Sequence, residues 1–254
     1  MHHFMQYVNA RYGMSLADYG ELYDWSIEES PVFWETLWAY SEVIHSRSYD
    51  QVVDDINKMP GARWFEGARL NFAENLLQYR DDHIALSFKG ETRPTVSITY
   101  NELYQQVARL AQSLRDLGIQ PGDRVAGFMP NMIETVVAML AATSVGAIWS
   151  SCSPDFGIKG VLDRFGQIEP RVLFTADGYF YNGKEFDSLD RILEIIKDLP
   201  SIEKIVVVPY KDTEPDITNM AKFVLFDDFL ASEAEDLIFE QLPANHPLSI
   251  LYSS

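Results

Sequence analysis

Cysteine and histidine are scarce in this sequence, and their scarcity limits the chemistry that it can support. Cys152 is the single cysteine among 254 residues, so no disulfide can form within the chain, and we predict a reducing, cytoplasmic location. The histidines are scattered without the spacing of metal ligands, and we predict no metal site among them: His2, His3, His45, His83 and His246.

Long hydrophobic runs are missing too. The longest apolar stretch runs from Ile133 to Trp149, but it contains Glu134 and several small residues and lies between turn signals. A buried helix and strand explain this stretch better than a membrane span. The first residues, Met1 to Phe4, show no basic region followed by an apolar core, so we expect no secretory signal and no membrane partner.

Basic residues are few: 20 Lys and Arg against 38 Asp and Glu give a net charge of −18. The resulting field repels nucleic acid, so we predict no nucleic-acid partner. An anionic ligand would be held by local devices instead, such as backbone N–H groups, helix N-termini, a few placed Lys or Arg residues and a metal ion.

The common catalytic fingerprints are also missing. The chain has no Gly-x-Ser-x-Gly, no Gly-x-Gly-x-x-Gly and no complete Gly-rich loop ending in Lys. We therefore assign no catalytic residue within this chain. An unrelated Rossmann-like nucleotide-binding enzyme is disfavoured, because no Gly-rich fingerprint follows any predicted strand.

What the sequence does contain is a change of pattern near residue 80. Residues 1–80 are helical and rich in aromatics, and four of the five Trp residues fall before position 65. We predict that these aromatics pack a helical N-terminal cap, with a ligand or partner surface as the alternative. Residues 81–254 alternate strands and helices, which predicts an α/β domain.

The strands of this second part are apolar enough to be covered on both faces, so we predict a parallel sheet built from βαβ units. A capping box of Thr99 and Glu102 opens one helix, and Ser153-Pro154 is predicted to cap another. The predicted strands lie at 84–88, 96–99, 124–129, 147–151, 172–175, 204–208, 223–226 and 248–252, and the predicted helices between them include 132–145 and 188–197.

Ligands in such folds lie at the carboxyl ends of the parallel strands. Residues 150–155 follow one strand and bring serine hydroxyls and free N–H groups to a helix N-terminus, although these serines are also expected simply to cap that helix. Residues 177–187 form another loop, in which Lys184 beside Gly183 suits a phosphate contact or, alternatively, a solvated turn. Cys152 is predicted to be an inert thiol.

Several segments resemble the acetyl-CoA and acetoacetyl-CoA synthetases, which are acyl-CoA synthetases of the adenylate-forming superfamily. Residues 64–77, WFEGARLNFAENLL, are similar to a pattern of this branch, and residues 122–131 contain its GDRV and MPN motifs. Residues 150–157 (SSCSPDFG), 160–170 and 181–187 (YNGKEFD) resemble the acetoacetyl-CoA synthetases more closely. The resemblance extends from Phe4 to Ser254.

The resemblance implies an acid–thiol ligase that uses ATP, Mg²⁺ and coenzyme A, with acetoacetate as the acid, and a fold that forms the first part of the family's large domain. It implies that Lys184, Gly183 and Ser151 contact coenzyme A, and that Ser253 and Ser254 begin the loop that holds the ATP phosphates. We expect the chain to stop before the rest of that loop. The remainder of its own chain is then its main protein partner, and the fragment alone is expected to be inactive.

Two alternatives to an acetoacetate ligase stay open from the sequence. One is a ligase for another short acid, such as acetate or propionate. The other is a short, non-catalytic binding module derived from such an enzyme.

Overall fold

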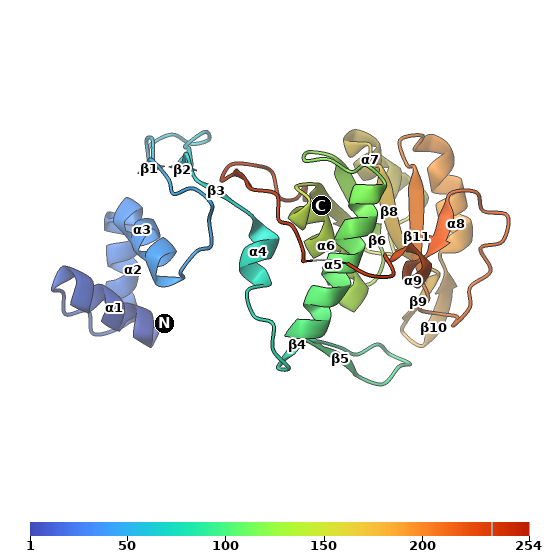
Figure 1. Ribbon diagram of the computed structural model, residues 1–254, viewed down its shortest axis with the longest axis horizontal. Coiled ribbons are helices and arrows are strands. Elements are labelled where there is room, and N and C mark those ends of the chain that lie inside the picture. Colours follow the sequence, from blue (N-terminus) through green and yellow to red (C-terminus); the bar gives the residue numbers. More distant parts are fainter. Residues whose placement is uncertain (235, 254) are drawn as a thin grey trace. The chain divides into compact units, whose positions relative to one another are not determined.

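The computed structural model describes residues 1–234 and 236–253, and it divides into two compact units. The N-terminal unit comprises Met1–Leu70 with Gln241–His246, and the sheet unit comprises Asn71–Glu240 with Pro247–Ser254. Figure 1 labels most of the elements of each unit. Residues 71–80, which the sequence pattern groups with the helical cap, fall in the sheet unit by this division.

Three helices and two small antiparallel pairs form the N-terminal unit. Asp18 caps α2 by accepting a hydrogen bond from the N–H of Glu21, and Phe4, Val8, Leu22 and Trp25 are buried between the helices. The elements are α1 (His2–Tyr12), α2 (Tyr19–Glu28), α3 (Ser30–Tyr40), β1 (Gln51–Val53) paired with β2 (Trp64–Glu66), and β3 (Arg69–Leu70) paired with β13 (Leu242–Pro243).

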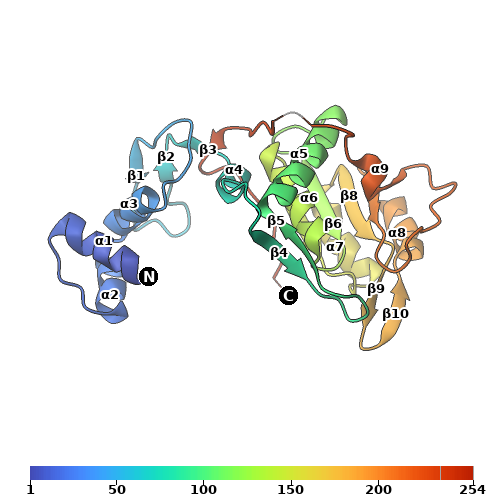
Figure 2. The same ribbon diagram turned by 60° about the horizontal axis from the view of Figure 1, so that its bottom comes forward.

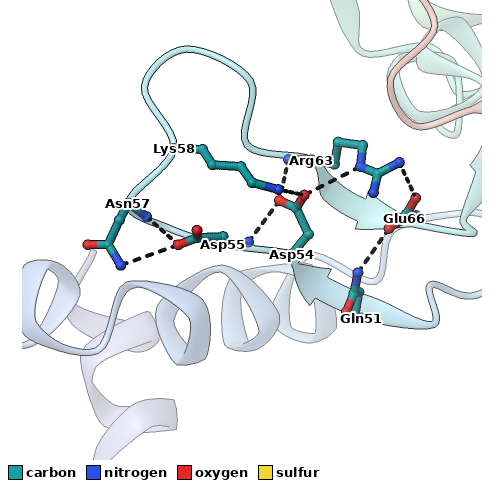
Figure 3. Close-up of polar contacts among 7 residues, drawn as sticks. All are labelled: Gln51, Asp54, Asp55, Asn57, Lys58, Arg63 and Glu66. Carbon is teal, nitrogen blue, oxygen red and sulfur yellow. Dashed lines mark hydrogen bonds and ion pairs between the residues drawn. The ribbon is translucent and has the colours of Figure 1, made fainter.

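The loop between β1 and β2 is organised by one carboxylate (Figure 3). Asp54 accepts hydrogen bonds from Lys58 Nζ at 2.6 Å and from the N–H groups of Asp55 and Arg63, each at 2.8 Å. The Lys58 ammonium, followed by the Arg63 N–H, holds the pKa of the Asp54 carboxyl well below its usual range. Across the pair, Gln51 donates to Glu66 at 2.9 Å.

The sheet unit alternates strands and helices as predicted (Figures 1 and 2). Five parallel strands stand in the order β12-β11-β8-β6-β7, and β4 and β5 form a separate antiparallel pair. The elements are α4 (Phe72–Leu76), β4 (Ile84–Phe88), β5 (Val96–Thr99), α5 (Tyr100–Asp116), β6 (Arg124–Phe128), α6 (Ile133–Ser144), β7 (Ile148–Cys152), α7 (Ile158–Ile168), β8 (Val172–Ala176), β9 (Gly178–Tyr181), β10 (Lys184–Asp187), α8 (Leu189–Ile195) with the 3₁₀ turn η1 (Ile196–Asp198), β11 (Lys204–Val208), β12 (Phe223–Leu225) and α9 (Phe226–Phe229).

Side chains of the central strands are buried on both faces. In β8, Val172 and Phe174 belong to one hydrophobic cluster with α5 and α6, whereas Leu173 belongs to a second cluster with α7 and α8. The alternation follows from the two-residue period of a strand, and burial of both faces is the reason that these strands are continuously apolar. The predicted α/β class with a parallel sheet is confirmed.

The capping box that opens α5 is present, since Thr99 Oγ1 accepts from the N–H of Glu102 at 3.1 Å and Glu102 accepts from the N–H of Thr99 at 2.7 Å. Two local predictions are wrong. Helix α7 begins at Ile158 with Gly157 as its N-cap, so Ser153 does not cap it. Residues 178–187 form a hairpin of two strands instead of a loop.

Among the described residues, no helix has the length and apolar character needed to cross a membrane.

Candidate functional site

A cleft of about 340 Å³ lies beyond the carboxyl ends of strands in the sheet unit, where ligands of parallel α/β folds bind. It is bounded by Pro130, which follows Met129 after β6, by the loop after β7, by β9 and by the segment after β11. Its lining consists of Pro130, Ser153, Pro154, Asp155, Tyr179, Phe180, Tyr181 and Tyr210. The aromatic side chains make its walls suited to a flat, apolar ring with polar edges.

The β9–β10 hairpin supplies one of these walls. Its strands pair from Gly178↔Asp187 to Tyr181↔Lys184, which leaves Asn182 and Gly183 as the two turn residues. Both have positive φ, 52° and 70°, the geometry that a two-residue hairpin turn requires and that Asn-Gly adopts readily. Lys184 is therefore the first residue of β10, and its side chain is exposed.

The tip of this hairpin is hydrogen-bonded to a carboxylate side chain of the protein itself. Glu91, in the loop between β4 and β5, accepts hydrogen bonds from the N–H groups of Asn182 and Gly183, each at 2.9 Å. The N–H of Gly183, a residue that we expected to contact coenzyme A, thus has an internal partner. No acidic side chain within residues 1–234 and 236–253 forms an ion pair with the neighbouring Lys184 ammonium.

A buried carboxylate positions the wall formed by Tyr210. Asp177 accepts hydrogen bonds from the N–H groups of Tyr210, Lys211 and Asp212 at 2.6–2.8 Å, and this fixes the segment that leaves β11. The Tyr210 ring lies 5.8 Å from that of Phe180, and the Arg93 guanidinium stands 5.1 Å over it. Burial raises the pKa of the Tyr210 hydroxyl, so it stays a neutral hydrogen-bonding group at physiological pH.

Residues 153–157, called here the cleft loop, are held from two helices. Arg191 of α8 donates to the carbonyl of Pro154 at 2.7 Å, and the Arg164 guanidinium of α7 lies 4.4 Å over the Phe156 ring. The adjacent Cys152 is buried, and burial raises the pKa of its thiol. This agrees with the prediction of an inert thiol, because a thiolate is the reactive form.

None of the predicted contact residues that the structure describes belongs to the cleft lining, although Gly183 and Lys184 follow Tyr181 at its hairpin wall. Ser151 is exposed on β7, where it pairs with Gly127 of β6. Ser253 is exposed and follows residues 248–252, called here the tail segment, while Ser254 lies outside the described residues. The structure brings Lys184 and Gly183 together at the hairpin and leaves Ser151 on a separate strand.

The tail segment runs beside β7. Its predicted strand is reduced to a single parallel bridge between Ser249 and Trp149, in which the N–H of Trp149 donates to the carbonyl of Leu248 at 3.1 Å. The N–H of Ile250 then donates to the carbonyl of Trp149 at 2.9 Å, and Ser150 Oγ donates to the carbonyl of Ile250 at 2.8 Å. The tail segment therefore enters the same end of the sheet as the cleft loop.

Sequence reasoning missed Glu91, Arg93 and Tyr210. Nothing in the local pattern around these residues links them to positions 177–183, because the link is made by tertiary structure. The hairpin itself had a usable signal, since Asn182-Gly183 between Tyr181 and Lys184 is the strongest short hairpin pattern. Recognising it would have placed the Tyr179 to Tyr181 run in a strand.

Comparison with known proteins identifies the family of the chain. The AMP-binding enzyme family matches residues 72–254, and the family described as the acetyl-coenzyme A synthetase N-terminus matches residues 19–76. The chain belongs to the AMP-binding enzyme family. Its cleft is formed within the part that this match covers.

Two relatives and one solved structure are similar in sequence to this chain along nearly its whole length. It is 47% identical to the acetoacetyl-CoA synthetase of Gallus gallus over 100% of this chain and 39% of that protein. It is 44% identical to the malonamoyl-CoA synthetase vrtB of Penicillium aethiopicum over 99% and 37%, respectively. The structure of acetoacetyl-CoA synthetase from Streptomyces lividans aligns with a TM-score of 0.91 at 42% identity, over 99% of this chain and 38% of that one.

This chain therefore spans less than two fifths of the length of the relatives that it matches.

Proposed function

We propose that this chain is the N-terminal part of a ligase that joins acetoacetate to coenzyme A and uses ATP to do so. The observation that carries the proposal is similarity to acetoacetyl-CoA synthetases along the whole chain, including the cleft loop and the β9–β10 hairpin. Those two segments line the cleft, so the similarity extends to the residues that would meet a ligand. The single cysteine supports a cytoplasmic location as part of the same proposal.

The proposed reaction has two steps. A carboxylate oxygen of acetoacetate attacks the α-phosphorus of ATP, the bond from that phosphorus to pyrophosphate breaks, and an acyl-adenylate forms. The sulfur of coenzyme A then attacks the acyl carbon, and AMP leaves with the electrons of the broken carbon–oxygen bond, while the thiol proton is released. Activation is needed because a carboxylate oxygen is a poor leaving group and AMP is a good one.

In this proposal the chain supplies the sheet scaffold and one wall of the coenzyme A site. The aromatic cleft suits a purine ring, and the exposed Lys184 ammonium on β10 would meet a phosphate of the same ligand. Gly183 contributes by forming the turn, because its N–H is bound by Glu91. Ser151, exposed on β7, would contact coenzyme A only from outside the cleft lining.

The ATP side of the proposal concerns the end of the described chain. Ser253, with Ser254, would begin the loop that holds the ATP phosphates, and backbone N–H groups and hydroxyls are the groups that such loops use. Mg²⁺ would neutralise charge on those phosphates. No group of three or more His, Cys, Asp or Glu side chains within the described part of the chain could hold a metal ion, so we assign no residue of this chain to it.

The acid is tested on the full-length protein that contains this chain. Thioester formation is measured with acetoacetate, acetate, propionate, butyrate and malonamate at limiting concentrations. We expect acetoacetate to give the highest kcat/KM. A tenfold preference for acetate or propionate would replace acetoacetate as the substrate, and a lack of thioester with every acid would favour a non-catalytic binding module.

The role of Lys184 is tested with coenzyme A and dephospho-coenzyme A. A hydrogen bond to a charged group contributes about 1.5–3 kcal/mol, so Lys184→Ala should raise the KM for coenzyme A about tenfold to a hundredfold. Dephospho-coenzyme A, which lacks the phosphate in question, should remove most of this difference. Lys159→Ala, an exposed cation on α7, is the matched control.

A Lys184→Ala defect that persists with dephospho-coenzyme A would show that Lys184 does not hold that phosphate. A defect in the acid-dependent exchange of pyrophosphate into ATP would show instead that Lys184 acts in the adenylation step.

A further inference from the structure

Arg164 of α7 lies over two aromatic rings that come from different parts of the sheet unit. Its guanidinium carbon lies 4.4 Å from the centre of the Phe156 ring in the cleft loop and 5.7 Å from the centre of the Tyr252 ring in the tail segment. Its Nη1 donates to the carbonyl of Gly160 at 2.9 Å, one turn earlier in the same helix. This hydrogen bond within α7 orients the guanidinium independently of its contacts with the two rings.

Gly160 gives this arrangement its space. A side chain at this position would bring Cβ to 3.2 Å from a ring carbon of Phe156 and 3.7 Å from Arg164 Nη1. Glycine inside a helix lowers stability relative to alanine, so a packing requirement accounts for it here. The close approach of Phe156 and Arg164 is that requirement.

The tail segment is attached to the same residue by a second contact. Tyr252 Oη donates to the main-chain carbonyl of Arg164 at 2.7 Å, and the Tyr252 side chain is partly buried against α7. On its other side the tail segment is hydrogen-bonded to β7 through Trp149 and Ser150. Arg164 thus contacts both the cleft loop, which follows β7, and the tail segment, which runs beside β7.

We propose that Arg164 is a positioning residue that fixes the tail segment relative to the cleft loop, and so sets the position of Ser253 for ATP. The inference rests on the proposed function, in which the cleft binds coenzyme A and Ser253 begins the ATP phosphate loop. Arg164 touches neither ligand. It acts through its contacts with Phe156 and with Tyr252.

These ring contacts explain why an arginine is suited to the position. A planar guanidinium can lie over aromatic rings while its edge donates a hydrogen bond, whereas a lysine ammonium is a point charge without faces. Arg164→Lys should therefore keep the charge and lose most of the positioning. Arg191 provides a contrast, because it holds the cleft loop through the carbonyls of Pro154 and Phe156.

The experiment compares Arg164→Leu, Arg164→Lys and Arg191→Leu in the full-length protein. Adenylation is measured by ATP–pyrophosphate exchange with the preferred acid, and thioester formation by varying coenzyme A. We expect Arg164→Leu to raise the KM for ATP about threefold to thirtyfold with a smaller change in kcat, and Arg164→Lys to recover only part of it. Arg191→Leu should raise the KM for coenzyme A and leave that for ATP unchanged.

A second measurement does not depend on activity. Hydrogen exchange at the N–H of Ile250, which is bonded to the carbonyl of Trp149, should become faster in Arg164→Leu and stay at the wild-type rate in Arg191→Leu and in Lys159→Ala. If Arg164→Leu does not fold, Tyr252→Leu removes the other side of the same contact and should give the same faster exchange and the same rise in the KM for ATP.

Three results would overturn the inference. One is a wild-type KM for ATP in a folded Arg164→Leu protein, another is an equal rise in that KM for Arg191→Leu, and the third is unchanged exchange at Ile250. Failure of the proposed function looks different, because wild type itself would then give no pyrophosphate exchange with any acid, while the exchange rate at Ile250 would still report on the contact.

Discussion

The sheet unit and the N-terminal unit bury their apolar side chains in different ways. In the sheet unit, alternate residues of β8 and β11 enter clusters on opposite faces of one sheet. In the N-terminal unit, a small core is extended by ring pairs such as Trp38 and Phe65, whose centroids are 4.6 Å apart. A polar loop around Asp54 completes that unit.

Different forces therefore stabilise the two units. A sheet covered on both faces is stabilised mainly by burial, so its free energy of unfolding should respond strongly to lost volume and weakly to pH. The N-terminal unit buries its rings less completely, with Tyr19 at 59% and Tyr23 at 51% exposed, and its charged loop should make its stability depend on pH. Four experiments test this contrast, and the first should change stability most.

Removal of the Phe174 ring should cause the largest loss of stability. Phe174 is fully buried in the central strand β8, with its ring 6.3 Å from that of Trp149. Phe174→Ala should lower the free energy of unfolding of the sheet unit by about 3–5 kcal/mol, because it leaves a cavity between packed layers. Urea unfolding followed by circular dichroism measures this. Phe72→Ala, at a ring that is 40% exposed, should cost much less, and equal losses would contradict the comparison.

Asn71 tests whether a buried polar side chain contributes as much to the stability of the sheet unit as a buried apolar one. Its Nδ2 donates to the carbonyls of Thr143, Ser144 and Glu240 at 2.9–3.2 Å, and its Oδ1 accepts from the N–H of Ala73. Asn71→Ala should lower the free energy of unfolding by about 2–3 kcal/mol, since buried acceptors lose their donor.

Asn71→Asp separates the two roles of that side chain. It keeps the oxygen that caps α4 and loses the donor, so it should be at least as destabilising as Asn71→Ala at neutral pH. Recovery of wild-type stability in Asn71→Asp would show that only the helix cap matters.

Glu91 tests a polar contact at the exposed tip of the β9–β10 hairpin. Glu91→Ala should make hydrogen exchange at the N–H groups of Asn182 and Gly183 about threefold to tenfold faster, because these groups lose their acceptor. The effect should be modest, because solvent screens polar interactions at an exposed hairpin tip. Nuclear magnetic resonance measures exchange at each amide. Glu185→Ala on β10 is the control, and an equal acceleration there would mean that the hairpin frays for another reason.

Substitution of Asp54 should have the smallest effect on stability, and this effect should depend on pH. Its pKa in the folded chain is below the ordinary value of about 3.9, so the stability it contributes is fully present above that value and is lost as pH falls through the folded pKa. The urea midpoint of Asp54→Asn, followed by tryptophan fluorescence, should differ from wild type at neutral pH and converge with it in acid. Asp24→Asn on α2 should match wild type throughout, and a difference for Asp54→Asn that is independent of pH would contradict the assignment.

Local patterns predicted much of the fold and little of the cleft. The predicted strand at 204–208 coincides with β11, and the predicted helix at 132–145 differs from α6 by one residue at each end. In contrast, the cap expected at Ser153 is absent, because the chain turns at residues 153–156 before it enters α7 at Ile158. The Ser151 and Lys184 assignments as contacts to coenzyme A stay predictions.

The order of strands and helices and the burial of both sheet faces follow from local sequence patterns, because hydrophobic periodicity and caps act over a few residues. Which loops meet at the cleft depends instead on contacts between distant parts of the chain. Glu91 reaches the N–H groups of Asn182 and Gly183 across about ninety positions, and Arg164 meets Tyr252 across 88. Such contacts leave no local periodic signal. The cleft itself depends on the parallel strand order β12-β11-β8-β6-β7, which brings the segments after β6, β7, β8 and β11 to one end of the sheet.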